Sequence, residues 1–175
     1  MAGTVYVDES KARGFRLAAV LVQDSQASRA RTRMRGHVAA GAHRVHFVKE
    51  RTARRRAILA TIASLGVVVA VIEAPDGCRA SEQRRRAIAE LTRWACSVGA
   101  RRIVVERDEN TIALDRRAIE SVLAGLQGRS ALEYEHVPAR SEPLLWIADA
   151  IAWAWARGGE WRRLAELMGA AVIRA

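Results

Sequence analysis

Three acidic residues occupy places in the sequence where carboxylates often do chemistry. Asp8 and Glu106 each follow a short β-rich run, and Asp149 is the only acid in the apolar stretch from Leu144 to Ala156. A carboxylate in apolar surroundings needs a cation, a metal ion or a set of hydrogen-bond donors, because burial disfavours its charged form. Three carboxylates brought together cannot all stay ionised without a cation, and hard oxygen ligands favour Mg²⁺ or Mn²⁺. The pattern therefore predicts a metal site formed by Asp8, Glu106 and Asp149.

Such a site favours cleavage of a phosphodiester bond. Two divalent ions roughly 3.5–4 Å apart activate a water molecule and stabilise the leaving oxygen. We therefore expect a metal-dependent nuclease or phosphodiesterase. Glu50, at the start of an expected helix, is a fourth candidate catalytic carboxylate, and its alternative role is to neutralise Arg54 one helical turn later.

Each acid also has a structural interpretation. Asp8 is typical of a turn or capping residue after a strand, and Asp149 of a buried ion pair with an arginine such as Arg107. Glu9 should point to the opposite side of the strand from Asp8, because side chains alternate along a strand. His46 is a candidate proton shuttle, although a packed histidine is the simpler interpretation.

The place of Glu106 depends on how the strands are ordered. Asp108 is an alternative for its role, and so is Glu73 if the run from Val67 to Ile72 is strand four rather than strand three. The sequence leaves these alternatives open.

Hydrophobic periodicity predicts the elements that must position these acids. Apolar runs indicate five strands, at residues 4–7, 15–22, 67–72, 103–105 and 132–137. Amphipathic segments indicate helices at residues 24–35, 52–65, 81–98, 112–126, 144–156 and 160–168. In the helix at residues 81–98, Arg84–Arg86 are expected to point largely outward.

The order of these elements is that of a ribonuclease H-like α/β fold. We expect a five-stranded mixed sheet flanked by helices, with residues 24–65 inserted as a basic helical segment between strands two and three. In this architecture strand four lies beside strand one, so Asp8 and Glu106 should emerge next to each other, with Asp149 as the third acid. A length of 175 residues suits a single domain, residues 1–175.

Positive charge is concentrated in the first third of the chain. The formal net charge is +10, and residues 1–60 hold 13 basic against 4 acidic residues. A localised basic surface is typical of nucleic-acid binding, because neutralised phosphates release counterions. Since 27 of the 29 basic residues are arginine, a compositional bias is the alternative explanation. The candidate phosphate-binding residues are Arg29, Arg31, Arg33, Arg35, Arg51, Arg54 and Arg55.

Short motifs resemble a known family. Residues 6–10 read Tyr-Val-Asp-Glu-Ser, and residues 143–150 read Pro-Leu-Leu-Trp-Ile-Ala-Asp-Ala. They resemble the bacterial domain-of-unknown-function family 3800, which is regarded as ribonuclease H-like and has the patterns Tyr-x-Asp-Glu-Ser and Leu-Leu-Gln-x-Ala-Asp. Residues 46–50, 105–108 and 115–117 resemble intermediate blocks of its compact actinobacterial branch.

This resemblance spans residues 4–161 and implies an acidic site without an established substrate. Two departures concern contacts near the substrate. Lys11 stands where a glycine often follows Asp-Glu-Ser, and Trp146 stands in place of the glutamine.

Other features bear on the cellular location, the oligomeric state and the alternative function of the protein. The N-terminus lacks the basic start and apolar run of a secretory signal, so we expect a cytoplasmic protein, and the apolar stretch near residue 149 is too short to cross a membrane. Trp146 and Trp153 either stack on bases, bury a subunit contact or pack near Trp161, and a homodimer through these C-terminal helices is one expectation. The main alternative to an enzyme is a non-catalytic module on the same fold that binds nucleic acid or protein.

Overall fold

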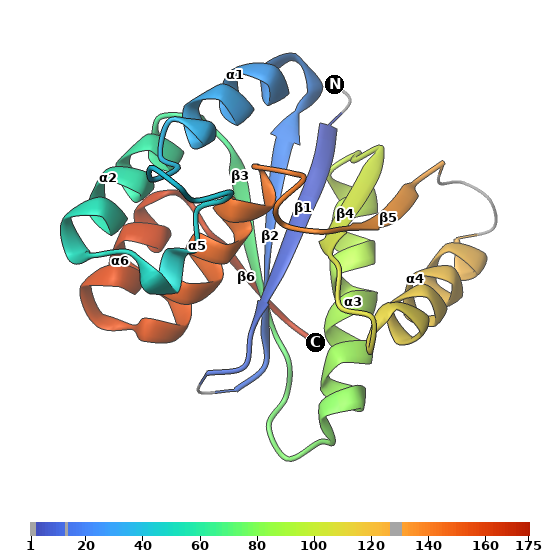
Figure 1. The fold of residues 1–175 in the computed structure, drawn as a ribbon. Coiled ribbons are helices and arrows are strands. Elements are labelled where there is room, and N and C mark those ends of the chain that lie inside the picture. Colours follow the sequence, from blue (N-terminus) through green and yellow to red (C-terminus); the bar gives the residue numbers. More distant parts are fainter. Residues whose placement is uncertain (1–2, 13, 127–130) are drawn as a thin grey trace.

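One mixed β-sheet organises the part of the chain that the structure describes. A computed structural model describes residues 3–12, 14–126 and 131–175 (Figure 1). Within these ranges six strands pair in the order β5-β4-β1-β2-β3-β6. Their bounds are β1 Gly3–Ser10, β2 Arg16–Gln23, β3 Val68–Glu73, β4 Arg102–Glu106, β5 Glu133–Val137 and β6 Ala171–Arg174.

The centre of the sheet has the pairing expected for strands one to four. β1 and β2 form an antiparallel hairpin, β3 adds antiparallel to β2, and β4 lies parallel to β1. The assignment of residues 67–72 as strand three is therefore confirmed. Glu73, at the end of β3, lies on the side of β2 away from β1. The near-continuous apolar runs of β1, β2 and β3 reflect burial on both faces of the sheet.

Helices cover both faces of the sheet, as Figure 1 shows. One face packs against α1 (Asp24–Arg35), α2 (Thr52–Ala63), α5 (Leu145–Arg157) and α6 (Gly159–Leu167). The other face packs against α3 (Ala80–Ser97) and α4 (Ile112–Gly125). Each expected helix is present within about two residues of its expected ends, and a single-turn 3₁₀ helix, η1 (Phe47–Lys49), lies between α1 and α2.

The expectation of five strands is wrong, because β6 adds a sixth. β6 pairs parallel to β3, with Ala171 opposite Ala70 and Arg174 opposite Glu73. Gly169 turns the chain after α6 with φ 77°, a conformation that favours glycine. The strand is only four residues long, which is too short for a period of two to stand out in the sequence.

The basic insertion lies where it was expected. α1, η1 and α2 follow β2 and precede β3, and their buried side chains join the core beneath α5. The helices bury Ala30 and Met34 from α1 and Ile58, Leu59 and Ile62 from α2. Of the helices in the described ranges, none has the length and apolar character that a membrane span requires.

Candidate active site

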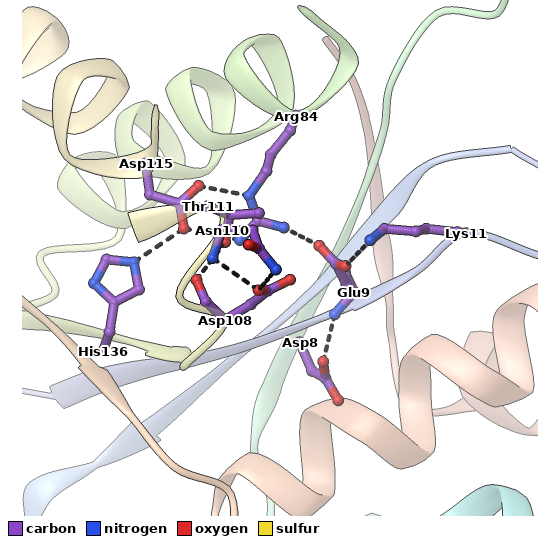
Figure 2. Close-up of polar contacts among 9 residues, drawn as sticks. All are labelled: Asp8, Glu9, Lys11, Arg84, Asp108, Asn110, Thr111, Asp115 and His136. Atoms are coloured by element: carbon purple, nitrogen blue, oxygen red, sulfur yellow. Dashed lines mark hydrogen bonds and ion pairs between the residues drawn. The ribbon is translucent and has the colours of Figure 1, made fainter. Parts of the chain in front are cut away.

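Alternation along the strands directs the acids of β1 to different faces. Tyr6 belongs to the core under α5, whereas Val5 and Val7 belong to the core under α3 and α4. Asp8 therefore faces α5, and Glu9 faces α3 and α4. Figure 2 shows the two carboxyl groups on opposite sides of β1.

The surroundings of Asp8 disfavour the ionised form of its carboxyl group. Burial, a hydrogen bond to Glu106, and repulsion from Glu106 and Asp149 raise the pKa of Asp8 well above its usual range, against a smaller opposing effect of Arg44. Its Oδ1 accepts the backbone N–H of Glu9 at 2.7 Å. Asp8 from β1 is therefore within electrostatic reach of Glu106 at the end of β4 and of Asp149 on α5, and their joint role as a metal site stays a prediction.

Asp149 approaches this group from the middle of α5. Burial raises its pKa, and repulsion from Glu106 adds to the rise, while the backbone N–H of Phe47 and the nearby His46 lower it. The N–H of Phe47 donates to Oδ2 of Asp149 at 3.1 Å. The first residue of η1 therefore fixes this carboxylate from the inserted segment.

Glu106 ends β4 beside Asp8 and carries an ion pair. Arg44, from the segment before η1, donates from Nη1 to Oε1 of Glu106 at 3.2 Å. A cavity of about 210 Å³ lies at the carboxyl ends of β1 and β4, and neither Arg44 nor Asp149 lines it. Asp8, Glu106 and Asp108 are among its lining residues. Ligand sites in open α/β sheets commonly lie at this edge.

The donors suit a hard cation in type, but the side chains are not arranged around one. The group consists of carboxylate oxygens, the ligands that Mg²⁺ and Mn²⁺ prefer. Across residues 3–12, 14–126 and 131–175, however, no three His, Cys, Asp or Glu side chains converge closely enough to hold a metal ion. The Arg44–Glu106 ion pair takes up one of the three carboxylates.

Comparison with known proteins supports the fold. No protein-family model matches the chain, and no curated protein matches it either. Among solved structures, the chain is similar to one from the complex of PCNA and RNase HII of Archaeoglobus fulgidus, with 19% sequence identity and a TM-score of 0.61. The match covers 95% of this chain and 78% of the other. Similarity at this identity concerns the fold alone, and it agrees with the ribonuclease H-like architecture expected from the order of elements.

The residues that the sequence offered as alternatives, namely a partner for Asp149 and two replacements for Glu106, make other contacts. Arg107 pairs with Glu109 rather than with Asp149. Asp108 accepts the backbone N–H of Asn110 at 3.0 Å, in the turn that leads into α4. Glu73 accepts from Arg16 and from the indole N–H of Trp155, each at 3.0 Å.

Glu50 has the contact expected from its structural interpretation. Nε of Arg54 donates to Oε2 of Glu50 at 2.5 Å across one turn, and Nη2 of Arg54 donates to the carbonyl of His37 at 2.6 Å. A catalytic role for Glu50 stays a prediction.

The seven candidate phosphate-binding arginines fall into two groups. Three guanidinium groups are engaged by the fold: Arg31 binds Glu142 and the hydroxyl of Tyr6, Arg54 binds Glu50, and Arg55 binds two carbonyls and stacks 4.2 Å from the ring centre of Trp153. The other four are exposed, and among the described residues they make no ion pair: Arg29, Arg33, Arg35 and Arg51.

Sequence reasoning missed a buried ion pair on the other face of the sheet. Arg84 was expected to point outward, but it is only 5% exposed and binds both carboxylate oxygens of Asp115, which is fully buried. The expectation is confirmed for Arg85 and Arg86 and wrong for Arg84, because a run of three arginines resembles a solvated face and the acid that pairs with Arg84 lies 31 residues away. Asp115, which directly follows the apolar residues Ile112–Leu114 of α4, was the available signal.

The tryptophans pack within the chain. Trp146 is 3% exposed and donates its indole N–H to the carbonyl of Ala139 at 2.6 Å. Trp153 lies edge-on to Phe47 and Trp161, with ring centroids 5.3 and 5.4 Å apart. Trp153 therefore packs against the terminal segment, which was one of its expected roles. A homodimer through these helices stays a prediction.

Proposed function

We propose that the protein is a metal-dependent nuclease whose Asp8, Glu106 and Asp149 hold Mg²⁺ or Mn²⁺. The observation that carries the proposal is the approach of three carboxyl groups from β1, β4 and α5, with raised pKa values at Asp8 and Asp149. A cation would relieve this repulsion and let all three ionise. Similarity to RNase HII in fold supports the same class of reaction, phosphodiester hydrolysis.

The residues of the site would have distinct roles as metal ligands and as groups that orient those ligands. A divalent cation, when bound, lowers the pKa of water and stabilises negative charge on phosphate oxygens. Phe47 holds the carboxylate of Asp149 through its N–H, and the Glu9 N–H holds that of Asp8. Glu50 is proposed to assist as a further carboxylate after release from Arg54. The motifs at residues 6–10 and 143–150 favour membership of family 3800, which we propose together with a cytoplasmic location.

A thermal-shift experiment tests the metal site. Mg²⁺ or Mn²⁺ is expected to raise the melting temperature of the wild-type protein, because a ligand that binds only the folded state stabilises it. Asp149→Asn should abolish the rise. Asp24→Asn is the matched control, since the same chemical change is made at an exposed acid at the start of α1. An equal response in wild type and Asp149→Asn would refute the site.

Activity is tested with labelled oligonucleotides of single-stranded and double-stranded DNA and RNA. Cleavage is expected with Mg²⁺ or Mn²⁺, and each of Asp8→Asn, Glu106→Gln and Asp149→Asn should reduce it by at least about 10²-fold, as expected for removal of a group that stabilises charge in the transition state. Asp24→Asn should cleave like the wild type. Cleavage that survives all three substitutions would contradict the assignment.

One observation favours the alternative of a non-catalytic binding module. Arg44 neutralises Glu106, and in the described part of the chain no three ligands converge on a metal position. In a metal enzyme the cation must displace Arg44 from Glu106. Arg44→Gln removes this competition and should therefore increase Mn²⁺ affinity. In a binding module neither wild type nor Arg44→Gln should respond to Mn²⁺, whereas oligonucleotide binding should persist.

A further inference from the structure

On the face opposite Asp149, a chain of polar and charged side chains centred on the buried Arg84 and Asp115 links four elements. Arg84 of α3 donates from Nε and Nη2 to the two oxygens of Asp115 on α4, at 2.6 and 2.8 Å. His136 of β5 contacts Oδ2 of Asp115 at 2.9 Å. The third nitrogen of Arg84, Nη1, donates to Oε2 of Glu9 on β1. Figure 2 shows these groups in one continuous array.

Glu9 links this array to the candidate metal ligand. The backbone N–H of Glu9 donates to Oδ1 of Asp8 at 2.7 Å, and Nζ of Lys11 lies 2.8 Å from Oε1 of Glu9. The side chain of Glu9 is thus held from one face of the sheet, and its backbone holds Asp8 on the other.

This end of β1 has less support from the sheet than the rest of the strand. Pairing between β1 and β4 ends at Val7 and Val105, before Asp8 and Glu9 are reached. Pairing with β2 continues to Ser10. On the β4 side, therefore, the end of β1 depends on side chains for its position, and Arg84 supplies a contact from a nearly fully buried guanidinium group.

We propose that Arg84 and Glu9 are positioning residues for Asp8. Arg84, held in a fixed orientation by Asp115, fixes the side chain of Glu9, so that the Glu9 N–H presents a constant donor to the carboxylate of Asp8. The bidentate geometry matters, because a planar guanidinium bound at two nitrogens to one carboxylate leaves the third nitrogen aimed in one direction. The inference rests on the proposed function only for the consequence that metal affinity depends on Arg84.

The first measurement needs no metal. Amide hydrogen exchange, followed by NMR in the metal-free protein, reports the protection of the N–H at position 9. Glu9→Ala removes the acceptor for Arg84 and leaves the backbone donor, and it should reduce protection at position 9 by at least about tenfold, with little change at Val5 and Val7. Glu9→Gln retains an oxygen for Arg84 and should restore most of the protection.

His136→Asn is the matched control, because it perturbs Asp115 from the far end of the array and leaves the contact between Arg84 and Glu9. It should lower overall stability without a selective effect at position 9. Arg84→Lys keeps the positive charge but cannot bridge Asp115 and Glu9 with a planar fork, so it should behave like Glu9→Ala. If position 9 keeps its protection in Glu9→Ala, or if His136→Asn reduces it equally, the positioning role is overturned.

The second measurement is the Mn²⁺ affinity of the same variants at a temperature where all are folded. Glu9→Ala and Arg84→Lys should weaken binding by about 10-fold or more, in line with the usual cost of losing an outer-shell partner, and His136→Asn by less than about twofold. In the Asp8→Asn background the effect of Glu9→Ala should disappear, because coupled residues do not act additively. Absence of Mn²⁺ binding in the wild type would refute the proposed function, while hydrogen exchange would still decide the role of Arg84.

Discussion

Asp8 carries a stability cost that depends on pH. Burial and its interactions with Glu106 and Asp149 raise its pKa well above the usual range. The folded protein therefore binds this proton more tightly than the unfolded chain does. Stability contributed by the protonated form is fully present below the unfolded pKa of about 4 and is lost as pH rises through the folded pKa.

We predict that Asp8→Asn raises the melting temperature of the metal-free protein at pH 7. Each unit of raised pKa that the substitution removes corresponds to about 1.4 kcal/mol, and 1 kcal/mol shifts the melting temperature of a protein of this size by about 2–4 °C. The variant should also have a flatter dependence of stability on pH between about 4 and 7. Denaturation followed by circular dichroism at several pH values measures both effects. A variant less stable than wild type throughout this range would mean that Asp8 is not in a repulsive environment.

At Asp115 the effects that lower the pKa exceed the effect of burial, in contrast to Asp8. Burial alone would raise its pKa, but hydrogen bonds from Arg84 and His136 lower it below the usual value. Its contribution to stability is therefore present above the unfolded pKa of about 4 and is lost as pH falls through the lowered folded value. A fully buried carboxylate is tolerated here because Arg84 contacts both of its oxygens.

We predict that Asp115→Asn lowers the free energy of unfolding by about 3–5 kcal/mol, because it leaves a buried guanidinium short of its partner. Chemical denaturation at neutral pH measures the loss. Glu166→Gln is the control: it removes the partner of Arg162 in an exposed pair on α6 and should cost less than about 1 kcal/mol. Equal losses in the two variants would show that Arg84 finds another partner when Asp115 is neutral.

At the scale of elements, β6 protects the outer edge of β3. Ile173 packs against the core under α3 and α4, whereas Val172, on the other side of the strand, is 47% exposed. We predict that Ile173→Ala costs about 1–2 kcal/mol, below the range for a fully buried isoleucine, and that Val172→Ala costs less than about 0.5 kcal/mol. Denaturant unfolding of the two variants provides the comparison. A cost for Val172→Ala equal to that for Ile173→Ala would contradict the register of β6.

Long periodic segments could be predicted from the sequence, and short or non-local features could not. α1 has its expected bounds, residues 24–35, because its apolar positions and the following Gly36 define both ends. β6 was missed because four residues carry little periodicity, and its pairing with β3 joins segments about 100 residues apart. Local pattern specifies an element, but pairing depends on the whole chain.

The same limit applies to the candidate site. The pairing of β1 with β4, which puts Asp8 and Glu106 at neighbouring strand ends, was expected from the order of elements, whereas a metal site that includes Asp149 stays a prediction. The ion pair of Arg44 with Glu106 was not, since an arginine in a loop gives no sign of the acid that it will meet. Contacts between side chains of different elements are fixed by packing, which the sequence alone does not display.

At the scale of the molecule, the exposed arginines of the inserted segment lie on the same face of the sheet as Asp8 and Asp149. The face covered by α1 and α2 carries Arg29, Arg33, Arg35 and Arg51, which are exposed and, in the described ranges, form no ion pair. On the other face, Arg85 and Arg86 of α3 share Glu82, and Arg93 pairs with Glu90, whereas Arg116 and Arg117 of α4 are exposed and form no ion pair with the described residues. The acid cluster lies on the face with the arginines of the inserted segment, because Asp8 and Asp149 approach each other between β1 and α5.

The position of these arginines beside the candidate site predicts which arginines hold a phosphate backbone. Replacing Arg29, Arg33, Arg35 and Arg51 by glutamine should weaken binding to a duplex oligonucleotide and flatten the plot of log affinity against log salt by up to about 0.9 for each phosphate that is no longer neutralised. The control replaces four arginines of α3 and α4, namely Arg85, Arg86, Arg93 and Arg117, and lowers the formal net charge from +10 by the same four units. Titrations by fluorescence anisotropy at several salt concentrations separate the two variants. If the slope decreases equally in both, net charge alone governs binding. If it decreases only in the first, the backbone lies along the inserted helices, beside the three carboxylates.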